Sequence, residues 1–257
     1  MRTKTAIVNI QFMNDGLVII PTYNEKENIE RIIKVVFSLN KTFDVLIVDD
    51  GSPDATGQIV KGLQSEYPDR LFLIEREGKQ GLGTAYITGF EWALRNSYEY
   101  VFEMDADFSH NPNDLERLYD ACVENGADLA IGSRYISGMN VVNWPLGRIL
   151  ISYFASAYVR FFTGMPIKDA TAGFKCYRRI VLETIDLDAV RFKGYAFQIE
   201  MKFKAYKHGF RLVEVPIVFT NRAEGVSKMS TSIFGEALFG VLQMKWDSLF
   251  QKYQRPK

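Results

Sequence analysis

The sequence has few of the residues that build disulfide frameworks and protein-held metal clusters. Among its 257 residues, only Cys122 and Cys176 are cysteines and only His110 and His208 are histidines. Neither cysteine belongs to a Cys-x-x-Cys pair, and the two histidines are far apart in the chain. A disulfide-stapled fold, a zinc site and a histidine-based metal site are therefore not expected.

An excess of one charge and long apolar runs are lacking as well. Lysine plus arginine and aspartate plus glutamate number 31 each, so the sequence predicts no basic field for nucleic acid. No apolar run reaches the roughly 18 residues of a membrane-spanning helix. The N-terminus does not have the pattern of a secretory signal. We therefore expect a cytoplasmic protein.

Short apolar runs alternate with helix-like patterns through the first half of the chain. A helix with a capping box at Asn24 and Glu27 is expected after the first run. The apolar runs predict five strands. Four have the bounds 17–20, 43–48, 71–74 and 128–131, and the fifth leads into the turn at 105–109. The alternation predicts an α/β fold with a doubly wound, mostly parallel sheet.

Four polar turns follow the expected strands. Because the carboxyl ends of parallel strands share one rim of the sheet, we expect these turns to lie together there: 22–25, 49–54, 76–83 and 105–109. Glycines occur in the third turn, but their spacing is neither that of a dinucleotide-binding loop nor that of a P-loop. A dehydrogenase or an NTPase is therefore disfavoured.

The fourth turn contains Asp105 and Asp107. Residues two apart on an extended strand point to the same side, so both carboxylates are expected to face one point. Such oxygen donors suit Mg²⁺ or Mn²⁺ held jointly with substrate phosphates. For an isolated Asp-x-Asp, a solvated acidic turn is the alternative. The neighbouring polar turns favour the metal site.

The ordered set of motifs resembles glycosyltransferase family 2 with its GT-A fold, and within it the polyprenyl-phosphate (dolichol-phosphate) mannose synthase group. The resemblance rests on Pro21-Thr-Tyr-Asn-Glu25, Val48-Asp-Asp-Gly-Ser-Pro-Asp54, Arg76-Glu-Gly-Lys79 and Glu103-Met-Asp-Ala-Asp-Phe-Ser-His110. Gly132-Ser-Arg-Tyr135, Ala172-Gly-Phe-Lys175 and Ser227-Lys228 extend it. We expect a catalytic domain at 13–230, an N-terminal extension at 1–12 and an amphipathic C-terminal helix within 231–257.

The resemblance implies a role for each matching residue. Catalytic roles fall to Asp107, Arg134 and Arg148, and metal binding to Asp105, Asp107 and Ser109. Arg134, Arg148 and Ser137 would bind an acceptor phosphate. The residues implied in nucleotide-sugar binding are Pro21, Thr22, Tyr23, Asn24, Glu25, Asp49, Asp50, Lys79, Asp105, Ala106 and Lys228.

The implied reaction is an inverting transfer of mannose from GDP-mannose to a polyprenyl (dolichyl) monophosphate, with Mg²⁺ or Mn²⁺ as cofactor. Another donor such as UDP-glucose, or a nucleotide-sugar-binding protein without turnover, remains the alternative. The second half of the chain has arginines and no obvious general base, which favours a phosphate acceptor.

A lipid acceptor implies contact with the cytoplasmic face of a membrane, directly or through a separate membrane subunit. The apolar stretches 146–162 and 233–250 are candidates for that contact, and core packing is the alternative for each.

Overall fold

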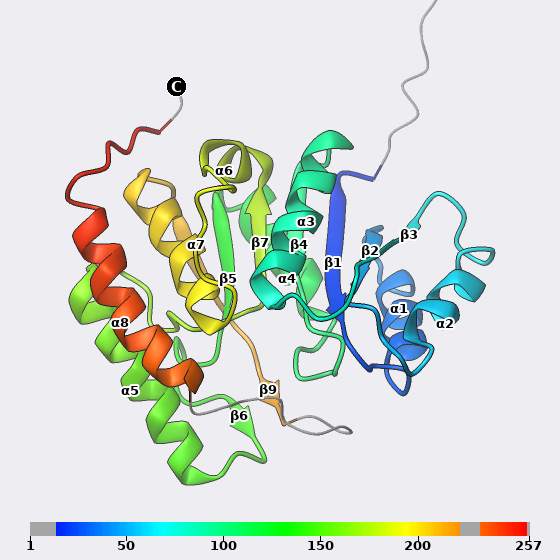
Figure 1. The fold of residues 1–257 in the computed structure, drawn as a ribbon, viewed down its shortest axis with the longest axis horizontal. Coiled ribbons are helices and arrows are strands. Elements are labelled where there is room, and N and C mark those ends of the chain that lie inside the picture. The colour runs from blue at the N-terminus through cyan, green and yellow to red at the C-terminus, as the bar shows by residue number, and fades with distance from the viewer. Residues whose placement is uncertain (1–13, 222–231, 256–257) are drawn as a thin grey trace, which may run out of the picture.

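The apolar runs become the strands of a seven-stranded sheet in the computed structural model, which describes residues 14–221 and 232–255 (Figure 1). The strands of this sheet are β1 (Gly16–Thr22), β2 (Asp44–Asp49), β3 (Leu71–Glu75), β4 (Tyr100–Glu103), β5 (Leu129–Ser133), β7 (Lys175–Arg178) and β8 (Leu212–Pro216). A second sheet pairs β6 (Val141–Val142) with β9 (Phe219–Thr220). The predicted extension at 1–12 lies outside the described residues.

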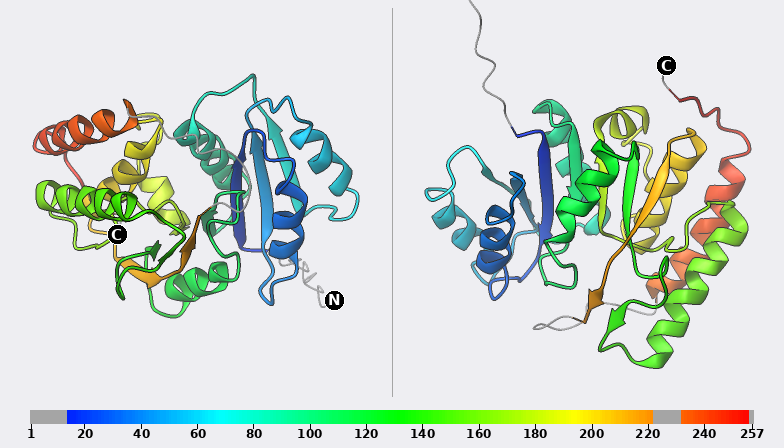
Figure 2. Two further views of the ribbon diagram at one scale, coloured as in Figure 1. Left: turned by 90° about the horizontal axis from the view of Figure 1, so that it is seen from below. Right: turned by 180° about the vertical axis from the view of Figure 1, so that it is seen from behind.

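Helices connect the strands and cover both faces of the main sheet (Figure 2). Their bounds are α1 (Ile29–Phe37), α2 (Thr56–Leu63), α3 (Leu82–Arg95), α4 (Asp114–Val123), α5 (Leu146–Thr163), α6 (Arg179–Thr184), α7 (Tyr195–Lys207) and α8 (Ser232–Asp247). Among the described residues, none of these helices is long and apolar enough to cross a membrane.

The main sheet has the strand order β3-β2-β1-β4-β7-β5-β8. All its neighbours pair in parallel except β7, which runs antiparallel to both β4 and β5. The predicted doubly wound, mostly parallel α/β sheet is therefore confirmed. Pro216 lies in β8, which ends the sheet, and an edge strand tolerates the lack of a backbone N–H in proline.

Alternation along the strands divides the core into two layers. On β1, Leu17 and Ile19 pack with α3 and α7, whereas Val18 and Ile20 pack with α1, α2 and α4. All four side chains are fully buried. A strand covered on both faces needs apolar residues at every position, which explains the continuous apolar run in the sequence.

Two local predictions are wrong. The helix α1 begins at Ile29 with Asn28 as its N-cap residue, not after a capping box at Asn24, because the backbone of Asn24 adopts a left-handed conformation in the turn. The strand β4 ends at Glu103, so the two aspartates that follow lie in a turn and do not alternate along a strand.

Candidate active site

The first two polar turns are joined by hydrogen bonds from backbone to side chain. The backbone N–H of Asn24 donates to Ser52 Oγ at 2.9 Å, and that of Glu25 donates to Thr56 Oγ1 at 3.1 Å. The turns follow the neighbouring strands β1 and β2, whose ends are in register. The predicted common rim is therefore built by direct contacts between the turns.

Asp49 is an anchor within this rim. Its side chain is buried and accepts hydrogen bonds from Thr22 Oγ1 at 2.8 Å and from the backbone N–H of Ser52 at 2.9 Å. Thr22 lies in the first turn and Ser52 in the second, so Asp49 holds the two turns together. The roles of Asp49 and Asp50 in nucleotide binding stay predictions.

Asp50 connects the second turn to the third. Its carboxylate forms a buried ion pair with Arg76 and accepts a hydrogen bond from the backbone N–H of Gln80 at 3.2 Å. The ammonium of Lys79 lies 5.3 Å from the centre of the Tyr23 ring, so the third turn also reaches back to the first. Pro21 and Tyr23 are half-buried at this rim, and Asn24 is exposed.

Gly51 allows the second and third turns to approach closely. Its φ is +66°, and a Cβ atom at this position would lie 2.9 Å from the backbone nitrogen of Gly78. Only glycine meets both demands without strain. The glycine loop leads directly into a helix, because Gly81 is the N-cap residue of α3.

The acidic turn after β4 positions two carboxylates in different surroundings. Asp107 is 3% exposed, and its Oδ1 accepts hydrogen bonds from the Ser109 hydroxyl at 2.6 Å and from the Ser109 backbone N–H at 3.0 Å. The side chain of Asp105 is 36% exposed. Ala106 between them is buried. Ser109 thus orients Asp107, and its own role as a metal ligand stays a prediction.

These two carboxylates fit a metal ion that arrives with its substrate. Among the described residues, no three or more histidine, cysteine, aspartate or glutamate side chains converge to hold a metal by themselves. Mg²⁺ is commonly held by one or two carboxylates together with substrate phosphates and water. The oxygen donors of Asp105 and Asp107 match this requirement.

His110 closes the acidic turn from within the protein. Its ring stacks on Phe174 at 4.8 Å between centroids and meets Phe219 edge-on at 5.3 Å. Burial lowers the pKa of His110 to about 4, although the negative charge of Asp107 acts in the opposite direction. The ring is therefore neutral at physiological pH and serves as an aromatic support for the turn.

A buried polar network lies directly before the acidic turn, and the sequence reading missed it. Glu103 forms an ion pair with Lys175 at 3.0 Å, and both side chains are fully buried. Glu103 also accepts hydrogen bonds from Tyr177 at 2.8 Å and from Gln198 at 2.7 Å. Glu103 and Lys175 are partners across β4 and β7. A charged residue at the end of an apolar run, two positions before Asp105, was the signal.

Tyr86 of α3 lies close to the same carboxylates. Its side chain is fully buried, and burial raises its pKa well above the ordinary value. The negative charges of Asp105, Glu103 and Asp107 raise the pKa further. Tyr86 therefore keeps its proton and presents a neutral hydroxyl to this acidic region.

Arg134 follows β5 and is held by Asp169. Its Nε and Nη2 donate to the two carboxylate oxygens of Asp169 at 2.7 and 2.6 Å, and Nη2 also donates to Thr171 at 2.8 Å. Burial alone would raise the pKa of Asp169, but the Arg134 guanidinium outweighs burial and lowers it. The sequence reading did not include this carboxylate, which fixes the orientation of Arg134.

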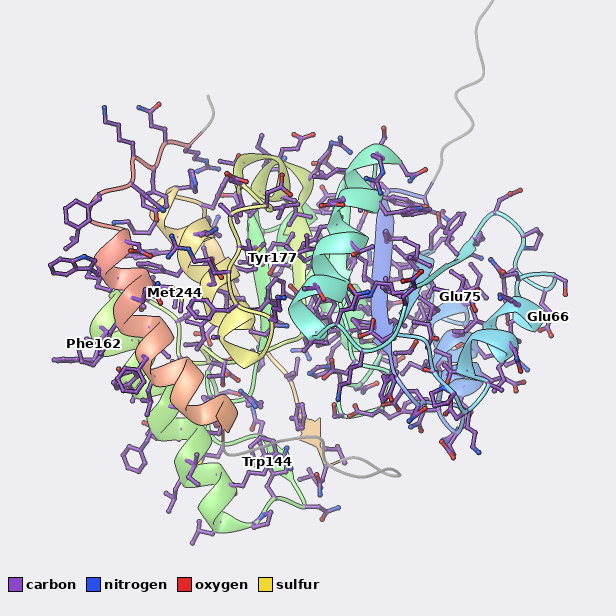
Figure 3. The ribbon with its side chains drawn as sticks, in the orientation of Figure 1. Glu66, Glu75, Trp144, Phe162, Tyr177 and Met244 are labelled. Atoms are coloured by element: carbon purple, nitrogen blue, oxygen red, sulfur yellow. The ribbon has the colours of Figure 1, made fainter. Side chains whose placement is uncertain are left out.

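Trp144 brings the two predicted acceptor arginines together. The guanidinium carbon of Arg148 lies 4.0 Å from the centre of the Trp144 ring, and that of Arg134 lies 5.6 Å from it. Arg148 also donates a hydrogen bond to Asn221 Oδ1 at 3.0 Å. Figure 3 shows the Trp144 side chain between the start of α5 and β9.

Phe219 on β9 links the arginines to the acidic turn. Its ring contacts His110, Trp144 at 5.3 Å and the guanidinium of Arg134 at 5.6 Å. The next residue, Thr220, donates its backbone N–H to the carbonyl oxygen of Ser109 at 3.1 Å. The candidate acceptor side chains and the candidate metal ligands therefore belong to one region of the molecule.

Two predicted residues are not brought into this arrangement by any contact described for them. Ser137 is exposed in the loop after Arg134, where its hydroxyl accepts a hydrogen bond from the Asn140 amide at 2.8 Å. Lys228 lies outside the residues that the structure describes. Their roles stay predictions.

Comparison with known proteins identifies the group to which this site belongs. The sequence model described as glycosyl transferase family 2 matches residues 17–186. The chain is 53% identical over 227 residues to the polyprenol monophosphomannose synthase of Mycolicibacterium smegmatis. The alignment covers 88% of this chain and 85% of that protein. It is 45% identical over 237 residues to the undecaprenyl-phosphate mannosyltransferase of Micrococcus luteus. That alignment covers 91% of this chain and 96% of the relative.

Solved structures share the fold at low sequence identity. The mannosyltransferase PcManGT from Pyrobaculum calidifontis, in complex with GDP-Man and Mn²⁺, matches with a TM-score of 0.57 at 18% identity over 96% of this chain and 67% of that one. Glucosyl-3-phosphoglycerate synthase from Mycobacterium tuberculosis, in complex with Mn²⁺ and UDP, matches with a TM-score of 0.64 at 17% identity over 92% and 80%.

Proposed function

The chain belongs to glycosyltransferase family 2 and has its GT-A fold, and on that basis we propose that it transfers mannose from GDP-mannose to a polyprenyl monophosphate at a membrane surface. The observation that carries the proposal is the arrangement of Arg134 and Arg148 around Trp144, next to the acidic turn. The names of the two curated relatives support the same acceptor class and the same sugar.

A phosphate acceptor matches the side chains at hand. The second pKa of a phosphate monoester is about 6, so the acceptor is largely dianionic at neutral pH and needs no general base. It needs positive charge, and an arginine fork suits the geometry of phosphate. Arg134 and Arg148 provide two such forks. An oxygen of this phosphate forms the new bond to the anomeric carbon while the bond from that carbon to the diphosphate breaks, with inversion.

The donor side of the reaction falls to the four turns. Asp105 and Asp107 would hold Mg²⁺ or Mn²⁺, which offsets the charge that develops on the leaving diphosphate. Asp50 and Lys79 would bind the nucleotide part of the donor. Because Arg76 and Gln80 fix Asp50 in place, the nucleotide contact is preorganised.

The acceptor role of Arg148 allows a clean test. Arg148→Ala should raise the KM for polyprenyl phosphate about 10- to 100-fold and leave the KM for the sugar donor unchanged, because a charge-assisted phosphate contact is worth about 1.5–3 kcal/mol. The exposed Arg95, on α3, provides the control Arg95→Ala. An unchanged acceptor KM would refute the role. Arg134 is less suitable, since its removal would leave Asp169 buried without its partner.

The donor is tested by transfer of radiolabelled sugar to polyprenyl phosphate in detergent, with GDP-mannose compared with UDP-glucose. Labelled lipid from GDP-mannose, lost with EDTA, is the expected result. If only UDP-glucose gave labelled lipid, the proposed type of reaction would stand, but the proposed donor, GDP-mannose, would be refuted. Donor binding without any lipid product would favour a binding protein without turnover.

We also infer a peripheral membrane contact through α5 and α8, on the cytoplasmic face. The two helices pack against each other at one end of the molecule, where Tyr158 donates to the carbonyl oxygen of Leu238 at 3.0 Å (Figure 1). Both expose large apolar side chains to solvent, among them Leu146, Phe154 and Phe161 on α5 and Phe239 and Trp246 on α8. Exposed apolar patches of this kind mark surfaces that bind other apolar surfaces.

A further inference from the structure

A hollow of about 320 Å³ lies between α5 and the loop after β5. Its volume is within the roughly 300–1,000 Å³ of small-molecule sites. None of its lining residues belongs to the donor, metal or acceptor residues discussed above: Tyr135, Gly138, Met139, Tyr153, Arg160 and Lys168. The hollow borders the proposed acceptor site, since the guanidinium of Arg134 lies 5.3 Å from the centre of the Tyr135 ring, but other residues form it.

The hollow contains two cations that lack an acidic partner. Among the side chains that the structure describes, no carboxylate lies within ion-pair distance of Arg160 or Lys168, and the buried Nε of Arg160 makes no hydrogen bond. Lys168 Nζ donates to the carbonyl oxygen of Ile136, at 3.1 Å. The neighbouring carboxylate of Glu214 accepts from the backbone N–H of Lys168 at 2.7 Å. An uncompensated guanidinium in a partly buried site favours an anionic ligand.

The position of the hollow on α5 relates it to the exposed apolar surface. Tyr153 and Arg160, which line it, are seven residues apart and so lie on one side of the helix. Phe154 and Phe161 follow them directly and are 63% and 82% exposed. The apolar stripe of α5 therefore runs along the edge of the hollow. An anion held there would lie beside side chains that prefer an apolar environment.

We propose that this hollow binds the phosphate of an anionic phospholipid while the apolar stripe of α5 lies in the membrane surface. The proposal rests on the membrane contact inferred above. The formal net charge of the protein is zero, so a preference for anionic lipid has to come from a local site. The hollow supplies two cations, and the half-exposed ring of Tyr153 at its rim is of the kind enriched at membrane interfaces.

The test is flotation of the full chain on two kinds of vesicle, one of phosphatidylcholine and one of equal parts phosphatidylcholine and phosphatidylglycerol. The variant Arg160→Gln/Lys168→Gln should lower partition onto the anionic vesicles about 30-fold, because each cation near an anionic surface is worth about 1 kcal/mol. Partition onto phosphatidylcholine should stay at the wild-type level. Thermal unfolding of both proteins checks that the variant is folded.

The matched control is Lys61→Gln/Arg95→Gln, which removes the same charge from exposed positions on α2 and α3. It should partition as the wild type does. An equal loss in the control would reduce the effect to overall charge and overturn the site. The site is also overturned if the Arg160→Gln/Lys168→Gln variant binds anionic vesicles as the wild type does.

Two further outcomes separate this proposal from those on which it rests. A raised KM for polyprenyl phosphate in detergent, without phospholipid, would assign the hollow to the acceptor and overturn the phospholipid site. A wild type that floats on neither vesicle would refute the membrane contact and the hollow's role together. Sugar transfer in detergent would still report separately on the proposed reaction.

Discussion

Removal of one member of the buried Glu103–Lys175 ion pair should destabilise the protein strongly. Both side chains are fully buried, and the nitrogen and oxygen are 3.0 Å apart. A charge left in such a place without its partner typically costs about 3–5 kcal/mol. In Lys175→Met, the carboxylate of Glu103 keeps its hydrogen bonds from Tyr177 and Gln198. We therefore expect a loss near the lower limit, about 3 kcal/mol.

Replacement of the other member of the pair, Glu103→Gln, should destabilise the protein less. Burial already lowers the pKa of Lys175, and the negative charge of Glu103 acts against that shift. Without Glu103, Lys175 would lose its proton more readily and avoid part of the penalty. The double variant Glu103→Gln/Lys175→Met has no unpaired charge and should be more stable than Lys175→Met alone.

The assay is urea unfolding of the wild type, both single variants and the double variant, with the four unfolding free energies combined in a cycle. We expect a coupling energy of at least about 1.5 kcal/mol. Additivity within about 0.5 kcal/mol would show that the two charges do not stabilise each other and would refute the reasoning. A change in the slope of the urea dependence would show instead that the unfolded state has changed.

Three more predictions follow from the site. Asp107→Asn should keep the fold and lower the transfer rate at least about 100-fold, because it removes the charge of one of the two carboxylates that would hold the metal ion; transfer rates and thermal unfolding check this. The free energy of unfolding should fall by at most about 3 kcal/mol through His110 as the pH drops from 6.5 towards the folded pKa of about 4. The reason is that His110 takes up its proton first in the unfolded state. In His110→Phe, urea midpoints at pH 7.5 and 5 should therefore differ less than in the wild type. Gly51→Ala should cost about 1–3 kcal/mol and raise the KM for the donor, because its Cβ would push against Gly78; an unchanged urea midpoint would contradict this.

The sequence was sufficient for the parallel part of the sheet because its signals are local. Leu17 to Ile20 form a continuous apolar run with polar residues after it, and such a run is typical of a strand covered on both faces. The capping box failed because Asn24 and Glu27 have the right spacing but lie in a turn whose shape depends on Ser52, far along the chain. Local spacing cannot report such a contact.

The candidate site was predicted as a list of residues and not as an arrangement. The partners of Asp50 and Arg134, namely Arg76 and Asp169, come from other elements, and no periodicity identifies them. Lys175 was visible in a motif, but its partner Glu103 is revealed only by the pairing of β7 with β4. Contacts between distant segments, which set the orientation of each functional side chain, were beyond reach of the sequence alone.

The antiparallel strand β7 has a consequence for how the chain is made. It lies between β4 and β5, although it follows both of them in the sequence with α5 in between. During synthesis, β4 and β5 each expose an unpaired edge until residues 175–178 leave the ribosome. Open edges are sites of wrong pairing and aggregation, and such a late, long-range closure slows folding. The nascent chain is therefore most in need of a chaperone between the emergence of β5 and the arrival of β7.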